Sequence, residues 1–247
     1  MQLTVIGSSD AFGSGGRLQS CYHVAHTGGS FLIDCGATTL IGLEREKIDP
    51  NSISTIFITH LHGDHFSGLV WWLIHAIHVA KRTSPLVVTG PIGIEERFWL
   101  AAEALFPGSS KTPRGFELIF RTYQERVWLE EGPVAVKPFE VSHPSGAPPY
   151  ALRFEVEGKV IAFSGDTEWV ESLADAARDA DLFITECYGF EKPARYHLNW
   201  RTLAAELPKI NAGSVVLTHM GLDMLINQHL VSYPGVKLAV DGMKLSL

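Results

Sequence analysis

The chain has 247 residues, of which 46% are hydrophobic and 19% are charged, and 20 basic against 27 acidic side chains give a net charge of −7. This composition is ordinary for a globular protein, and the length predicts a single domain over residues 1–247. The lysines and arginines are scattered without a basic run, so the sequence lacks the charge pattern of a tRNA-binding protein.

The start of the chain and its cysteines indicate the compartment. A strand-like segment over 2–6 follows Met1 directly, with no basic and apolar leader, so no secretory signal is predicted. The cysteines Cys21, Cys35 and Cys187 are odd in number and lie in apolar surroundings, a pattern typical of reduced, buried thiols. We therefore expect a cytoplasmic protein that does not enter a membrane.

Strand-like and helix-like segments alternate along the whole chain. In the first half, apolar patterning predicts strands near 2–6, 20–25, 30–34, 54–58 and 86–89, and helices over 66–81 and 92–105. In the second half it predicts strands near 133–141, 150–157, 160–164, 181–185 and 214–218, and helices near 168–178, 200–207 and 222–231. Two short strands, 236–239 and 243–247, flank a turn signal at Asp241-Gly242. The second half thus repeats the organisation of the first.

Four side chains that can bind metal follow the predicted strand near 54–58: His60, His62, Asp64 and His65. His60 and His62 are two residues apart, so in extended backbone their side chains point to the same side. A glycine between His62 and Asp64 lets the chain turn, and the two ligand pairs can then face two metals. Imidazole and carboxylate without thiolate favour zinc, with manganese, iron and nickel as alternatives.

This His-x-His-x-Asp-His motif resembles the hallmark of the metallo-β-lactamase superfamily, and further family-like residues follow at predicted strand ends. The resemblance implies an α/β fold, namely a four-layer αβ/βα sandwich of two mixed β-sheets flanked by helices. It also implies two divalent metal ions at one edge of the sheets. The ligands that it implies are His60, His62 and His143 for one ion, Asp64, His65 and His219 for the other, and Asp166 as the bridge.

Within the superfamily, three segments resemble the ribonuclease Z and phosphodiesterase branch: the opening strands with Phe31–Gly36, then Ile184–Cys187, and His197–Asn199. In that branch a Glu and a His in the last two segments protonate the leaving group. The resemblance implies this catalytic role for Glu186 and His197. A helix-capping or surface position of the Glu would produce the same pattern. Asp64 is expected to orient the attacking hydroxide while it binds metal.

One departure from ribonuclease Z bears on the substrate. That enzyme carries a long tRNA-gripping insertion between the segments that match His143 and Asp166, which here are only 23 positions apart. We therefore expect a metal-dependent hydrolase that acts on a small phosphodiester or related ester through a metal-bridging hydroxide, and we do not expect tRNA as its substrate. Open alternatives are a lactonase, another carboxylic ester hydrolase, a β-lactam-type hydrolase and a ribonuclease Z-like endonuclease.

The predicted helix over 66–80 is apolar on nearly every face and therefore needs cover on more than one side. Dense local packing, a homodimer contact or a wall of the substrate pocket would each provide that cover. His75 and His78 on this helix are expected to be structural, because the motif already supplies a full ligand set. Trp169 and Tyr188, beside the segments of Asp166 and Glu186, are candidate pocket walls.

Overall fold

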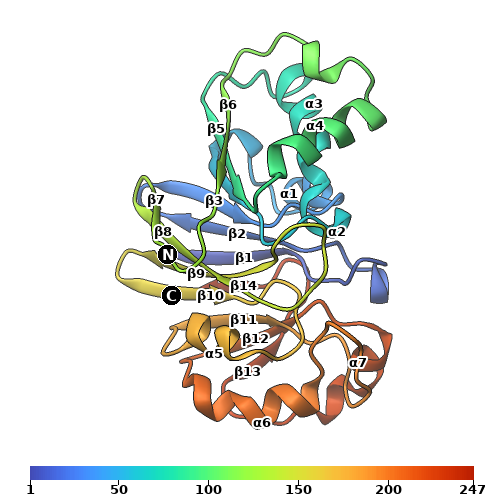
Figure 1. Ribbon diagram of the computed structural model, residues 1–247, viewed down its shortest axis with the longest axis vertical. Helices are drawn as coiled ribbons and strands as arrows, with labels where there is room; N and C mark the ends of the chain where they lie inside the picture. Colours follow the sequence, from blue (N-terminus) through green and yellow to red (C-terminus); the bar gives the residue numbers. More distant parts are fainter.

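The computed structural model describes residues 1–247 and consists of two facing β-sheets with helices on their outer sides (Figure 1). Each sheet has seven strands and contains both parallel and antiparallel pairs. The predicted αβ/βα sandwich of two mixed sheets is confirmed. None of the helices is both long enough and apolar enough to span a bilayer.

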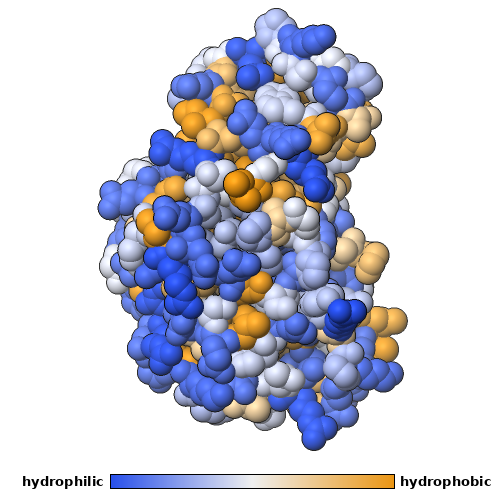
Figure 2. Space-filling model, viewed as in Figure 1, coloured by the Kyte–Doolittle hydropathy of each residue, from blue (hydrophilic) through white to orange (hydrophobic).

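The first sheet contains the N-terminal strands together with the last strand of the chain. From edge to edge it consists of β14 (Lys244–Ser246), β1 (Gln2–Gly7), β2 (Cys21–His26), β3 (Gly29–Ile33), β4 (Ile53–Phe57), β5 (Leu86–Gly90) and β6 (Leu118–Thr122). Its outer face is covered by α1 (Thr39–Arg45), α3 (Gly68–His78) and α4 (Ile94–Leu105), with the short α2 (Gly63–Phe66) before α3. In Figure 1 the part with β5, β6, α3 and α4 protrudes at the top, and Figure 2 shows apolar atoms in several separate places on it.

The second sheet contains the strands of the second half. Its order is β13 (Val236–Leu238), β12 (Val215–Thr218), β11 (Leu182–Glu186), β10 (Lys159–Phe163), β9 (Tyr150–Val156), β8 (Val134–Glu140) and β7 (Leu129–Glu131). Three helices cover its outer face: α5 (Glu171–Ala177), α6 (Trp200–Ile210) and α7 (Leu222–Asn227). In Figure 1, α6 lies along the bottom of the molecule.

The strands divide their apolar residues between two faces because successive side chains point in opposite directions. Phe31 and Phe57 point to the interior of the sandwich, where both meet Phe154 of the other sheet at ring-centroid distances of 5.4 and 5.1 Å. Leu32 and Ile56, one position along, point outward to the helices instead. The result is a central core between the sheets and one helix-covered core on each outer side.

Several boundaries differ from the sequence prediction. The expected helix over 66–81 is two helices, with Ser67 between them, and α1, β6 and β7 were not predicted. The final two strands do not pair with each other, because β13 lies beside β12 while β14 lies beside β1 in the other sheet. The turn at Asp241-Gly242 therefore carries the chain from one sheet to the other. Asp241 stabilises it by accepting hydrogen bonds from the backbone and hydroxyl of Ser8.

The apolar helix after the motif is covered locally. Trp72, Leu73 and Ala76 of α3 are buried against the outer face of the first sheet and against α4, whereas Trp71 on the other side is 37% exposed. Dense local packing thus accounts for the buried face of α3.

Candidate metal centre

All seven predicted metal ligands meet at one edge of the sandwich. Each follows a strand whose carboxyl end lies at that edge: β4, β8, β10 or β12. Strands that run in the same direction end on the same side of a sheet, which explains how residues far apart in sequence converge. Every member except His62 is buried; the full set is His60, His62, Asp64, His65, His143, Asp166 and His219.

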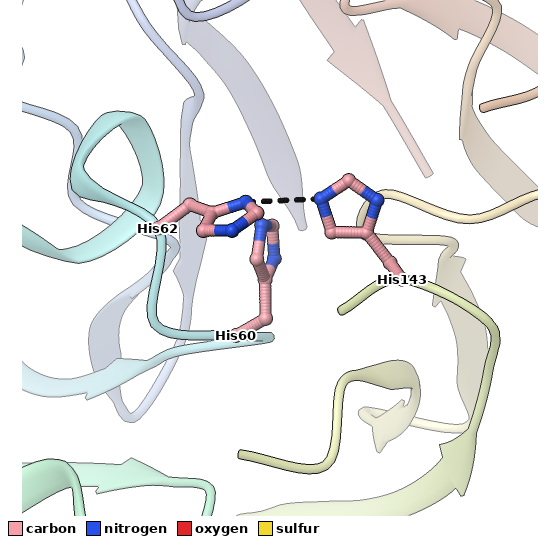
Figure 3. A group of neighbouring side chains, drawn as sticks. All are labelled: His60, His62 and His143. Carbon is pink, nitrogen blue, oxygen red and sulfur yellow. Dashed lines mark hydrogen bonds between the residues drawn. The ribbon is translucent and has the colours of Figure 1, made fainter. Parts of the chain in front are cut away.

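One group consists of three histidines whose rings point toward one another (Figure 3): His60, His62 and His143. Nε2 of His143 lies 3.0 Å from Nδ1 of His62, and the three ring centroids are 4.8 to 5.0 Å apart. Burial, followed by the neighbouring His65, lowers the pKa of His60 well below its usual value. His60 is therefore neutral, the form in which imidazole binds metal.

The second group contains Asp64, His65, Asp166 and His219. Nε2 of His65 lies 3.2 Å from Asp64 and 3.3 Å from Oδ1 of Asp166, and Nε2 of His219 lies 3.2 Å from Asp64. Burial alone would raise the pKa of Asp166, but the imidazoles of His219 and His65 hold that pKa well below its usual range. Asp166 is therefore a carboxylate.

The Asp166 carboxylate lies between the two groups. Its Oδ2 is 3.9 Å from Nε2 of His60 and 3.7 Å from Nε2 of His143, while Oδ1 faces His65 of the second group. One carboxylate within reach of both groups is the arrangement in which an acidic side chain can contact two cations.

Unpaired buried atoms show that the cluster fits cations. Nε2 of His60, Nε2 of His65 and Oδ1 of Asp166 are buried and have no hydrogen-bond partner. Buried polar atoms are normally paired, and leaving one unpaired costs about 1–3 kcal/mol. Divalent ions held in the two groups would satisfy these three atoms, and the nitrogen and oxygen donors suit such ions. The buried His and Asp cluster therefore fits divalent metals.

In several of these histidines, a hydrogen bond to the ring nitrogen that points away from the cluster orients the ring nitrogen that faces the cluster. Nδ1 of His65 lies 2.6 Å from Asp34, and Nδ1 of His143 donates to the carbonyl of Tyr196 at 3.0 Å. In both rings this leaves the Nε2 lone pair directed at the cluster. Nδ1 of His60 similarly faces the hydroxyl of Thr59 at 3.0 Å.

Sequence reasoning did not identify Asp34 as part of this site. It directly follows β3 and is fully buried, and it also accepts hydrogen bonds from the backbone and hydroxyl of Thr59. Its backbone has φ 58, and His219 has φ 51, a left-handed conformation that non-glycine residues adopt mainly under external constraint. An acidic residue at the end of a buried strand was the available signal, but its partner His65 is 31 positions away.

The Asp34 contact leads to a test of metal binding. We expect Asp34→Asn to weaken metal affinity by roughly 10- to 100-fold, because the amide orients the His65 ring poorly and no longer supplies a negative charge. Titration with a competing chelator measures this. Asp49→Asn, which alters an exposed carboxylate in a turn before β4, is the matched control and should retain wild-type affinity. Equal affinities of the two variants would contradict the role of Asp34.

Glu186 and His197, which were predicted to form a pair, are in contact beside the cluster. Nδ1 of His197 lies 3.1 and 3.2 Å from the carboxylate oxygens of Glu186, which also accept hydrogen bonds from the backbone of Thr167 and Leu198. Burial alone would lower the pKa of His197, but the hydrogen bond and charge of Glu186 raise it to about 9. Burial raises the pKa of Glu186 against the opposing effect of His197. A ring nitrogen of His197 also lies within 4.8 Å of potential ligand atoms of His143 and Asp166.

A cavity of about 360 Å³ opens onto this cluster. Residues of both ligand groups and His197 line it. Tyr188 lines it, as predicted, and stacks on His197 with ring centroids 4.9 Å apart. Trp169 instead lines a neighbouring cavity that shares Ala194 and His197 with the first. The remaining lining residues include Asp10, Ala11 and Phe12 of the loop after β1.

Residues 1–232 match the model of the family described as Anti-Pycsar protein Apyc1. The chain belongs to this family. Curated relatives of this Apyc1-family chain include proteins named Ribonuclease Z. The one from Methanosarcina acetivorans is 25% identical over 300 aligned residues, which cover 100% of the chain and 98% of the relative. The one from Anoxybacillus flavithermus is 26% identical, and the alignment covers 100% of the chain and 97% of that relative.

Solved structures agree with the fold of the Apyc1-family chain. The short form of human tRNase Z has a TM-score of 0.81 at 25% identity, covering 100% of the chain and 99% of that protein. YhfI of Bacillus subtilis, described as a metallo-beta-lactamase fold protein, has a TM-score of 0.81 at 22% identity, covering 99% of the chain and 98% of that protein. The Apyc1-family chain is a metal-dependent hydrolase of the ribonuclease Z and phosphodiesterase branch of the metallo-β-lactamase superfamily, as its motifs predicted.

Proposed function

We propose that this protein is a binuclear phosphodiesterase that hydrolyses a small phosphodiester. The main support is the combination of two ligand groups with one shared carboxylate, Asp166, beside the hydrogen-bonded pair of Glu186 and His197. Such a site can position an attacking water on one side of a phosphorus atom. It can also place a proton donor for the leaving group on the other side.

The three-histidine group would hold one ion, and Asp64, His65 and His219 would hold the other, with Asp166 within reach of both groups. Divalent ions in these positions, with zinc preferred by the donors, would lower the pKa of water and stabilise negative charge on the phosphoryl group. Asp64 accepts a hydrogen bond from the attacking water and orients it. His197, held in its protonated form by Glu186, donates the proton on Nε2 to the leaving oxygen.

The size of the substrate is inferred from segments around the site. The stretch from His143 to Asp166 contains only a loop over 141–149 and the hairpin of β9 and β10, so no arm for a large RNA projects from it. The alignment with the Methanosarcina acetivorans relative runs over 300 positions, so that relative carries segments which this 247-residue chain lacks. A solved structure of similar fold is described as a diphosphatase of the PhnP family, at 20% identity and a TM-score of 0.79. The short hairpin and the segments that the chain lacks favour a small substrate.

An assay on two substrates tests this proposal. We expect the metal-loaded protein to hydrolyse bis(p-nitrophenyl) phosphate and to leave precursor tRNA essentially unprocessed at its 3′ end, because the chain lacks both an arm and a basic run for RNA. Release of p-nitrophenolate and gel analysis of the RNA measure the two reactions. Efficient cleavage of precursor tRNA at a single site would overturn the assignment to small substrates.

Ribonuclease Z activity is the second candidate because curated relatives with this name match the whole chain. The same metal cluster would also serve a lactonase or another carboxylic ester hydrolase, since a tetrahedral centre forms in those reactions too. Rapid opening of a lactone together with failure on phosphodiesters would identify that alternative.

A further inference from the structure

The loop after β1 places an unburied aromatic side chain at the entrance of the site. Phe12 is 85% exposed, more than any other large hydrophobic residue of the chain. It lines the same cavity as the ligands His62, His143 and Asp166. Tyr188, the other aromatic wall of that cavity, already stacks on His197, whereas Phe12 stacks on no other ring.

The loop that carries Phe12 is held in a defined shape. The buried Asp10 accepts hydrogen bonds through Oδ1 from the backbone of Phe12 at 3.2 Å and of Ser14 at 3.0 Å, and through Oδ2 from the Ser14 hydroxyl at 2.7 Å. Gln19 donates to the carbonyl of Ala11 at 3.0 Å. These bonds form an Asx-type turn that fixes the backbone on both sides of the ring.

Asp10 also lines the cavity, but its role differs from that of the metal ligands. Both carboxylate oxygens of Asp10 accept hydrogen bonds from its own loop, while the Asp166 carboxylate has an unpaired oxygen. Asp10 is therefore a positioning residue for the turn. A single exposed apolar side chain is ordinary on a protein surface. Phe12 differs from the others because a buried carboxylate fixes its turn and because it lines the cavity of the metal cluster.

We propose that Phe12 is the stacking platform for a planar aromatic group, such as a nucleobase or an aryl ring, on the non-leaving side of the phosphodiester. This rests on the proposed function and assigns Phe12 a role in substrate selection. A cavity of about 360 Å³ has room for such a ring next to the phosphoryl group. Stacking of a base on an aromatic side chain corresponds to about 5- to 150-fold in affinity. A preformed platform adds this without the cost of ordering a loop.

Two esters with one leaving group test the platform. For the metal-loaded protein, we compare kcat/KM on thymidine 5′-(p-nitrophenyl) phosphate with kcat/KM on methyl p-nitrophenyl phosphate. Phe12→Ala should lower the value for the thymidine ester by about 5- to 150-fold and leave the methyl ester within twofold. Phe12→Tyr should retain the wild-type preference, and Phe12→Leu, which is apolar but not planar, should lose most of it. Bis(p-nitrophenyl) phosphate shows whether an aryl ring suffices in place of a base.

The controls separate this proposal from the proposed function. Leu100→Ala, which shortens another exposed apolar side chain on α4, should change neither ester. Equal losses on both esters, or no loss on either, in Phe12→Ala would overturn the platform. If the wild-type protein hydrolyses no phosphodiester, the proposed function fails. In that case, calorimetry on thymidine 5′-monophosphate and on methyl phosphate tests Phe12 alone. If the ratio of the two affinities is the same in Phe12→Ala as in the wild type, the platform is overturned.

Discussion

Replacing His60 and His62 together by alanine is expected to lower the metal content of the purified protein from about two ions per chain to about one or fewer. The same variant should lose hydrolytic activity by at least about 10³-fold. The reason is that two of the three donors of the first group disappear, and a bound ion contributes several kcal/mol of charge stabilisation in the transition state. Elemental analysis and initial rates on bis(p-nitrophenyl) phosphate measure the two effects.

A matched control for this variant exists within the same chain. His75→Ala with His78→Ala removes two histidines three residues apart on α3, and neither belongs to the ligand cluster. This control should keep wild-type metal content and activity. A wild-type protein that is free of metal by elemental analysis and that added zinc or manganese does not activate would contradict the metal assignment.

His197→Ala is expected to keep the full metal content and to lower kcat by roughly 10²- to 10⁴-fold on a phosphodiester with a poor leaving group. The loss arises because the leaving alkoxide no longer receives a proton from the imidazole that Glu186 holds. On bis(p-nitrophenyl) phosphate the loss should be far smaller, since p-nitrophenolate needs little proton assistance. The ratio of the two losses is therefore the decisive quantity.

Glu186→Gln provides a graded comparison for the same step. The amide retains the shape of the side chain but removes the charge that raises the pKa of His197, so it should show the same substrate dependence in a milder form. Equal losses on both substrates with intact metal content would assign His197 to substrate positioning instead. Wild-type rates on both would assign the pair a structural role.

Short-range patterns in the sequence were enough to predict the ligand motif and the alternation of strands and helices, whereas the αβ/βα sandwich was implied by the family resemblance. His60, His62, Asp64 and His65 lie within six positions, and the alternation of apolar segments follows the periods of strands and helices. The superfamily resemblance implied that further ligands follow at strand ends, and His143, Asp166 and His219 are the residues at those positions. The same resemblance implied how the ligands are grouped.

The contacts between residues far apart in the sequence could be seen only in the folded protein. The hydrogen bond between Asp34 and His65 joins residues 31 positions apart. The pairing of β14 with β1 joins the two ends of the chain, so neither contact leaves a local pattern in the sequence. The platform of Phe12 is of the same kind, because an exposed aromatic residue in a glycine-rich loop acquires meaning only when the fold brings it to the metal cluster. Local sequence sets which backbone each segment adopts, whereas side-chain partners depend on which surfaces the packed sheets bring together.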